Sequence, residues 1–182
     1  MKKMLFLCTC LILVVSCNQL SPEEKLIMDS LDRKVDFGKL DIVHFSDATE
    51  ALESIRNRYH YIYLVSLQNG CRSCYQEYVF WQKEMNSYGS ADNFTILFII
   101  QGDDYDDFES ELMIYEPDFD LSTESFYIVM DPEQKFIDAN PEIDPGIIAN
   151  SIMIDEMNKI VLVGKPYASE QMKRLFEKII LE

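Results

Sequence analysis

The stretch QNGCRSC, residues 68–74, lies between an apolar run, Tyr61–Leu67, and an amphipathic run, Tyr75–Tyr88. The apolar run predicts a strand buried on both faces of a parallel sheet, and the amphipathic run predicts a helix. Cys71 then stands where the strand ends, and Cys74 follows one helical turn later. This junction predicts a redox pair in which Cys71 exchanges with a partner and Cys74 resolves the mixed disulfide.

The start of the predicted helix favours a thiolate on Cys71. A helix N-terminus carries unpaired N–H groups and a partial positive charge, which stabilise a nearby anion by roughly 0.3 to 2 kcal/mol. This stabilisation lowers the pKa of a cysteine thiol below its ordinary value. Arg72 adds a positive charge at the same place, so we expect Arg72 to stabilise the thiolate.

The first residues resemble a bacterial export signal. Lys2 and Lys3 precede an apolar run, Met4–Val15, which is too short to span a bilayer. Val14-Val15-Ser16-Cys17 resembles a lipobox, in which Cys17 becomes the acylated N-terminal residue. We therefore predict three parts of the chain: a lipoprotein signal peptide over residues 1–16, a lipid-anchored tether with a short helix and a first strand over 17–45, and one domain over 46–182.

Charge limits the partners of the chain. The formal net charge is -16, and removal of Lys2 and Lys3 leaves 14 cationic against 32 acidic residues, or -18. Nucleic-acid binding needs a surplus of Lys and Arg, so no nucleic-acid partner is expected. An acylated Cys17 would tether the chain to a membrane without spanning it. We expect a location in the bacterial cell envelope, at the outer membrane.

Cysteine usage narrows the chemistry further. Of the five cysteines, Cys8 and Cys10 leave with the signal and Cys17 carries lipid, so Cys71 and Cys74 remain. A pair in an exported compartment is expected to be oxidised or to cycle. The alternative is a structural disulfide in a non-enzymatic envelope protein, although so short a loop removes little entropy from the unfolded chain.

Further elements are predicted along the whole chain. Cys74, Tyr78 and Trp81 share one stripe of the Tyr75–Tyr88 helix, which we expect to face the core. The remaining predicted elements are a helix capped by Ser21, a strand Leu40–Phe45, a helix Ser46–Arg58, a strand Thr95–Gln101, a helix Asp103–Tyr115, a strand Ser125–Asp131, an irregular region Lys135–Ala149, a hairpin of Ser151–Asp155 with Lys159–Val163, and a helix Ser169–Leu181.

This order, with Cys71-Arg72-Ser73-Cys74 at a strand-to-helix junction and the hairpin that follows Ser151, resembles the thioredoxin fold. The strand Ser125–Asp131 is similar to the insertion in TlpA/ResA-type thioredoxins and their AhpC/TSA relatives. The lipoprotein signal is similar to that of thioredoxin-like lipoproteins of Bacteroidota. The resemblance covers about Ser46–Glu182.

The resemblance implies an α/β fold of three layers, with a central mixed sheet and helices on both faces. It implies a thiol–disulfide oxidoreductase that acts on protein thiols and disulfides of the cell envelope through Cys71 and Cys74. No cofactor and no metal are expected for this chemistry.

Three positions depart from the family pattern. Gly70 stands where members usually carry a tryptophan before the first cysteine. Val65 stands where many carry an acid or amide in the strand beneath the cysteines. The cis-proline that usually precedes the hairpin would fall near Ala149-Asn150-Ser151, and Pro145 lies too far upstream to take its place. These departures affect substrate docking and rate more than the fold.

Other chemistries of cysteine have fewer residues to support them. A thiol peroxidase needs a threonine three residues before its reactive cysteine, and Gln68 stands there. A copper-delivery protein would use a wider cysteine spacing and a later histidine, whereas His44 and His60 both precede Cys71. A zinc site would need these two histidines together with Cys71 and Cys74. We expect each histidine to lie at a strand edge instead.

Overall fold

The computed structural model describes residues 20–45, 48–85, 88, 93–123 and 125–181. The predicted signal peptide and Cys17 lie outside this part of the chain. Within it, no helix combines the length and the apolar composition that a membrane span requires.

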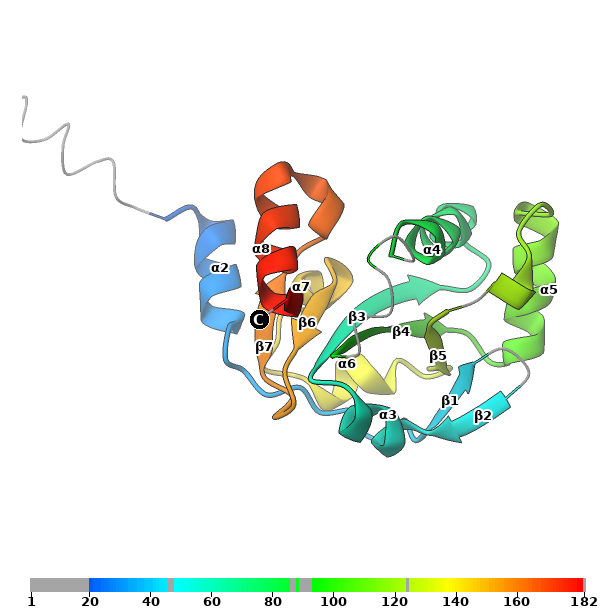
Figure 1. Ribbon diagram of the computed structural model, residues 1–182. Coiled ribbons are helices and arrows are strands. Elements are labelled where there is room, and N and C mark those ends of the chain that lie inside the picture. The colour runs from blue at the N-terminus through cyan, green and yellow to red at the C-terminus, as the bar shows by residue number, and fades with distance from the viewer. Residues whose placement is uncertain (1–19, 46–47, 86–87, 89–92, 124, 182) are drawn as a thin grey trace, which may run out of the picture.

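The centre of the molecule is a seven-stranded mixed sheet in the order β2-β1-β5-β4-β3-β6-β7 (Figure 1). β3, β4 and β5 run parallel, and β1, β2, β6 and β7 join by antiparallel pairing. The strands are β1 (Ile42–Phe45), β2 (Ala48–Ala51), β3 (Tyr61–Gln68), β4 (Phe94–Gln101), β5 (Tyr127–Met130), β6 (Ile152–Ile154) and β7 (Ile160–Val163).

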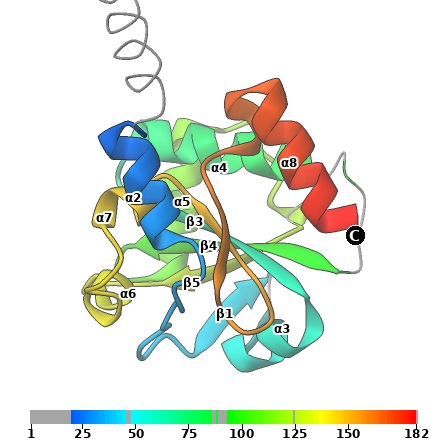
Figure 2. The same cartoon turned by 90° about the vertical axis from the view of Figure 1, so that its left-hand side faces the viewer.

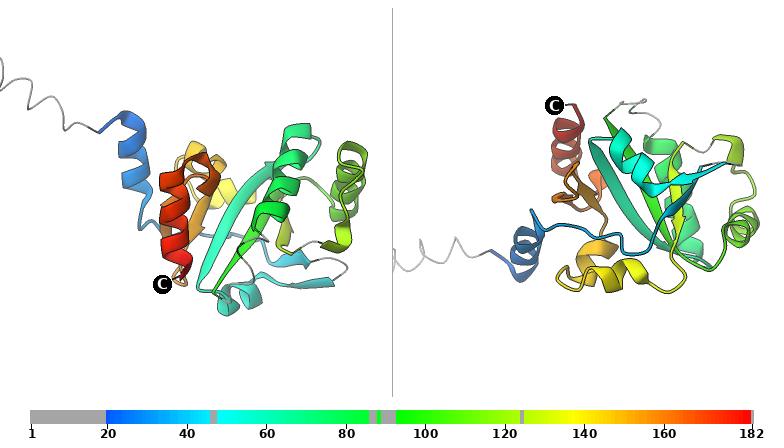
Figure 3. Two further views of the ribbon diagram at one scale, coloured as in Figure 1. Left: turned by 45° about the horizontal axis from the view of Figure 1, so that its top comes forward. Right: turned by 90° about the horizontal axis from the view of Figure 1, so that it is seen from below.

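Helices cover both faces of the sheet, which confirms the three-layer α/β prediction. Side chains of α4, α5 and α8 build one apolar core cluster, and those of α3, α6 and α7 build another on the opposite face. Figure 1 shows α4 above the central strands and α3 below them, and Figure 3 gives two further views of these layers. The helices are α2 (Pro22–Ser30), α3 (Leu52–Arg58), α4 (Arg72–Met85), α5 (Tyr105–Tyr115), α6 (Lys135–Ala139), α7 (Pro145–Ala149) and α8 (Glu170–Leu181), with short 3₁₀ turns η3 (Leu121–Thr123) and η4 (Pro166–Ala168).

The helix predicted over Ser46–Arg58 is wrong over residues 48–51, and residues 46 and 47 lie outside the described part of the chain. Ala48–Ala51 forms β2, which pairs with β1, and the helix α3 begins only at Leu52. Leu52 and Ile55 are buried, whereas the side chains of β2 lie mostly at the surface. Hydrogen bonding to the sheet edge therefore decides the structure of a segment whose few apolar residues also fit a helical period.

The region Lys135–Ala149, predicted to be irregular, contains the two short helices α6 and α7. Pro145 is the first residue of α7, and the side chain of Asp144 caps this helix by accepting from the N–H of Gly146 at 2.8 Å. Proline suits this position because the first N–H of a helix has no partner within it. Pro145 therefore marks a helix start.

The N-terminal segment is fixed to the sheet. Ser21 caps α2 in the predicted capping box, in which Glu24 N donates to Ser21 Oγ at 3.1 Å and Ser21 N to Glu24 Oε2 at 2.7 Å. After α2, Asp32 N donates to Ile160 O at 2.9 Å, and Val35 N to Asn158 O at 2.8 Å. This pairing covers the outer edge of β7, and β1 lies inside the sheet, so residues before 46 contribute directly to the fold.

Candidate active site at the start of α4

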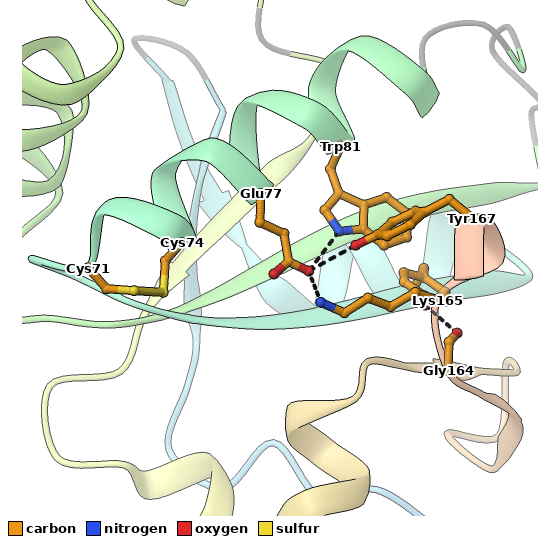
Figure 4. Close-up of polar contacts among 8 residues, drawn as sticks. Cys71, Cys74, Glu77, Trp81, Gly164, Lys165 and Tyr167 are labelled. Carbon is orange, nitrogen blue, oxygen red and sulfur yellow. Dashed lines mark hydrogen bonds and ion pairs between the residues drawn. A yellow bond between two sulfur atoms is a disulfide. The ribbon is translucent and has the colours of Figure 1, made fainter.

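Cys71 and Cys74 form a disulfide where β3 gives way to α4 (Figure 4). Their Cα atoms lie 5.2 Å apart. The carbonyl oxygen of Cys71 accepts from Cys74 N at 2.9 Å and from Tyr75 N at 3.2 Å, so Cys71 lies directly before the first turn of α4. Both cysteines are half-buried, and Cys74 packs against the core cluster beneath α4. The pair therefore lies where the sequence placed it, and its chemical roles stay predictions.

The turn before Cys71 is held by a buried phenol. Gly70 has a φ of +75°, and its N–H donates to Tyr75 Oη at 2.7 Å. The Tyr75 hydroxyl donates in turn to Asn69 Oδ1, and Asn69 Nδ2 donates to Asp107 Oδ2 at 3.0 Å. Burial raises the pKa of Tyr75, so the hydroxyl keeps its proton and remains a donor. This network connects the turn to both α4 and α5.

The positive φ at position 70 explains why glycine rather than tryptophan stands before the first cysteine. A positive φ is easily adopted by glycine and strained for other residues. A Cβ atom added at Gly70 would meet nothing within 4 Å, so the backbone conformation rather than lack of space selects glycine there. The exposed side of the turn opens onto a polar hollow of about 360 Å³ beside the carboxylates of Asp107 and Glu111. The approach to this side of the turn is therefore acidic.

Arg72 and Ser73 are both exposed in the first turn of α4. The hydroxyl oxygen of Ser73 lies 3.2 Å from Cys71 Sγ, close enough for a weak hydrogen bond. Arg72 is the first residue of the helix, and its stabilisation of a thiolate stays a prediction. The sequence interpretation overlooked Ser73, which follows Cys71 by two residues.

A polar cluster lies one turn further along the same side of α4 (Figure 4). Glu77 Oε1 forms an ion pair with Lys165 Nζ and accepts from Tyr167 Oη at 3.1 Å and from Trp81 Nε1 at 3.4 Å. The side chains of Glu77 and Lys165 are only 23% and 26% exposed. Burial and the Glu77 carboxylate raise the pKa of Tyr167, which keeps its hydroxyl protonated and able to donate.

Glu77 is a second residue near the disulfide that the sequence interpretation missed. The predicted acid position, Val65, is fully buried in the apolar core. Glu77 follows Cys74 by three residues, and side chains at this spacing are neighbours on one helix face. The spacing was therefore visible in the sequence, but the partner Lys165 comes from beyond β7 and only the tertiary structure brings it there.

The segment before β6 has an unusual backbone in place of the family proline. Asn150 ends α7, and Ser151 is buried with a φ of +67° directly before β6. Its carbonyl oxygen accepts from Gly164 N at 2.9 Å. Pro145 lies at the start of α7, so it does not take the position of the missing proline.

The histidines lie away from the disulfide and from each other. His44 on β1 stacks on Tyr105 with ring centroids 4.3 Å apart, and burial lowers the pKa of His44. His60 precedes β3, and its Nδ1 lies 2.8 Å from Glu156 Oε2. Within the described residues, no three His, Cys, Asp or Glu side chains gather as metal ligands would.

Comparison with solved structures assigns the fold. The thioredoxin domain of a thiol-disulfide oxidoreductase from Bacteroides vulgatus aligns with a TM-score of 0.56 and 14% identity, over 82% of this chain and 97% of that domain. A thiol-disulfide oxidoreductase from Bacteroides fragilis aligns with a TM-score of 0.51 and 14% identity, over 78% and 98%. A protein assigned as the thiol:disulfide interchange protein DsbE from Chlorobium tepidum aligns with a TM-score of 0.51 and 17% identity, over 82% and 96%.

No protein-family model matches the chain, and no curated protein sequence matches it. At 14% to 17% identity, the structural likeness shows the fold alone. The activity is argued from the chemistry of the site. The mixed sheet with helices on both of its faces agrees with the alignment to a thioredoxin domain. The chain therefore has the thioredoxin fold of the thiol-disulfide oxidoreductases to which it is similar.

Proposed function

We propose that this chain is a lipid-anchored thiol–disulfide oxidoreductase of the bacterial cell envelope. The observation that carries the redox part is the half-buried Cys71–Cys74 disulfide directly before α4. Structural neighbours named as thiol-disulfide oxidoreductases support the same chemistry. The anchor rests on the lipobox-like residues that end at Cys17, and the outer membrane is the proposed location.

The reaction needs only the two sulfurs and a partner dithiol. A partner thiolate attacks Cys71 Sγ, the Cys71–Cys74 bond breaks, and Cys74 leaves as a thiolate that takes up a proton. The second thiolate of the partner then attacks the partner sulfur that is bonded to Cys71. A disulfide forms within the partner, and Cys71 is released as a thiolate. Two electrons pass from the partner to this protein, and the reverse sequence reduces a partner disulfide. The substrates are accordingly protein thiols and disulfides, and no cofactor takes part.

The surroundings of each sulfur favour different steps. Cys71 precedes the helix N-terminus, where the partial positive charge and Arg72 stabilise its thiolate. Cys74 packs against the core, so an incoming protein thiol reaches Cys71 more easily. Glu77 lies on the same face of α4 as Cys74, so its charge acts on the ionisation of the Cys74 thiol.

Insulin reduction in the presence of dithiothreitol tests this function. The unsubstituted chain is expected to accelerate precipitation of the insulin B chain, and Cys71→Ser is expected to abolish the acceleration. Gln76→Ala is the matched control, because it changes an exposed side chain of α4 and leaves both sulfurs. A wild type without activity, or activity that survives Cys71→Ser, contradicts the proposal.

The structural-disulfide alternative is favoured by the packing of Cys74 against the core and by the absence of the family proline at Ser151. The reduction potential separates the two functions. A redox-active pair is expected near the potentials of thioredoxins and glutaredoxins, about -200 to -270 mV, whereas a structural bond is expected below roughly -300 mV.

A further inference from the structure

Two hydrogen bonds of Tyr75 enclose the cysteine pair. Its hydroxyl accepts from Gly70 N at 2.7 Å and donates to Asn69 Oδ1. Gly70 directly precedes Cys71, and Tyr75 directly follows Cys74. These bonds therefore join the residues on either side of segment 71–74, which the disulfide also closes.

The ring of Tyr75 is held by packing that does not depend on the disulfide. Tyr75 is fully buried in the core cluster of α4, α5 and α8. The rings of Phe108 and Tyr115 on α5 lie with their centroids 5.7 Å and 5.4 Å from its own. Figure 1 and Figure 2 show, in two views at right angles, that α4 lies over β3 and β4. The Tyr75 hydroxyl is therefore a fixed point beside the turn.

Gly70 is the joint between the sheet and Cys71. Asn69 N donates to Gln101 O at 3.0 Å, so the chain is still held to β4 one residue earlier. Glycine itself has little preference between positive and negative φ, and Gly70 is exposed beside the polar hollow. Without a fixed acceptor, its N–H can turn to water, and Cys71 can then move away from the helix start.

We propose that the Tyr75 hydroxyl is a positioning group for the redox reaction and holds Cys71 at the N-terminus of α4 while the disulfide is open. In the mixed disulfide and in the dithiol, the bond between the two sulfurs is absent, and the hydrogen bond from Gly70 remains. The Cys71 thiolate then stays where the helix N-terminus stabilises it, which also makes this sulfur a better leaving group. This inference rests on the proposed oxidoreductase function.

The pH profile of Cys71 alkylation by iodoacetamide tests the positioning. The chain from residue 20 onward holds every described residue, and with Cys74→Ser its single thiol is Cys71. The rate follows the thiolate fraction, so the midpoint of the profile gives the pKa of this thiol. Tyr75→Phe removes the hydroxyl and keeps the ring. We expect it to raise the pKa by about 0.5 to 1, which slows alkylation about three- to tenfold at a pH below the pKa.

Tyr78→Phe is the matched control, because it makes the same substitution one turn later in α4. The Tyr78 hydroxyl is also buried, and it accepts from Gln82 Nε2 at 3.0 Å. This variant loses a hydrogen bond in the same core and leaves the turn intact, so we expect an unchanged pKa of Cys71. An unchanged pKa in Tyr75→Phe, or an equal rise in Tyr78→Phe, overturns the positioning role. Urea unfolding establishes that each variant is folded.

Amide hydrogen exchange of Gly70 is a second measurement and needs no substitution at Tyr75. If the hydrogen bond persists in the reduced, unsubstituted chain, the Gly70 amide should exchange at least about tenfold more slowly than a glycine amide in an unfolded peptide. Exchange at the rate of the unfolded peptide overturns the proposal.

These outcomes are separate from those of the proposed function, which insulin reduction measures. A raised pKa in Tyr75→Phe, with no insulin reduction by the unsubstituted chain, would refute the function and leave the positioning of Cys71. Insulin reduction together with an unchanged pKa would refute the positioning alone.

Discussion

Glu77 and Lys165 are expected to act on the Cys74 thiol with opposite signs. Residues three apart on a helix have Cβ atoms about 5 to 6 Å apart, so the Glu77 carboxylate lies at about 6 Å or somewhat more from the Cys74 sulfur. At an effective dielectric constant of about 20, a unit charge at that distance changes the free energy of a thiolate by about 3 kcal/mol. Lys165 forms an ion pair with Glu77, so the two contributions largely cancel in the intact protein.

Removing one partner exposes the charge of the other. Glu77→Gln leaves Lys165 unpaired and is expected to lower the pKa of the Cys74 thiol, whereas Lys165→Met leaves Glu77 unpaired and is expected to raise it. Each shift should reach about 1, or about 1.4 kcal/mol, because solvent at the quarter-exposed pair weakens the field. The double substitution is expected to return close to the parent value.

Thiolate absorbance in a Cys71→Ser background measures this ionisation, because Cys74 is then the free thiol of the chain from residue 20 onward. Glu84→Gln is the matched control, since it makes the same change of charge on α4 at a distance beyond the Debye length at physiological salt. Shifts of the same sign for Glu77→Gln and Lys165→Met, or a shift as large for Glu84→Gln, would refute the electrostatic reasoning.

Three further substitutions test individual contacts of the fold. Gly102→Ala places a Cβ atom 2.8 Å from the Cβ of Asn69 and is expected to cost about 1 to 3 kcal/mol of stability in urea unfolding and to slow insulin reduction; full stability would show that the turn can move freely. Tyr63→Phe removes a buried 2.6 Å hydrogen bond to a backbone carbonyl oxygen and should cost about 1 to 3 kcal/mol in the same assay, with no loss expected if water reaches that oxygen. Burial lowers the pKa of His44 and outweighs the attraction of the acids at the start of α5. The unfolded chain therefore binds a proton at His44 at a higher pH than the folded chain does. The free energy of unfolding consequently falls as pH drops below the ordinary histidine pKa of about 6.5. His44→Phe keeps an aromatic ring against Tyr105. Between about pH 7.5 and 5.5, the melting temperature of this variant should therefore fall less than that of the wild type. An equal fall in both proteins would contradict this.

The central strands and the site junction were readable from the sequence. Tyr61–Gln68 and Phe94–Gln101 are nearly continuous apolar runs, and their length and their β-branched and aromatic content favour strands covered on both faces. The capping box at Ser21 and Glu24 is likewise local, because its partners lie three residues apart. The position of Cys71 before α4 follows from the same short-range pattern.

Segments with a weak pattern were decided by their neighbours. Ala48–Ala51 fits a helical period, yet it pairs with β1 because the sheet edge offers hydrogen-bond partners that lie outside the segment. Pro145 reads as a loop signal, yet it begins α7 because Ile147 and Ile148 find a core to enter. Local preference is small in such segments, so tertiary contacts outweigh it.

The sequence alone determined the two sulfurs, their spacing and the strand and helix on either side, because each of these depends on residues close together in the chain. Only the tertiary structure decided which charges surround them. Lys165 reaches Glu77 across 88 positions, and Asp107 reaches Asn69 across 38. Contacts at such separations depend on how the sheet orders its strands, which no local pattern in the chain records.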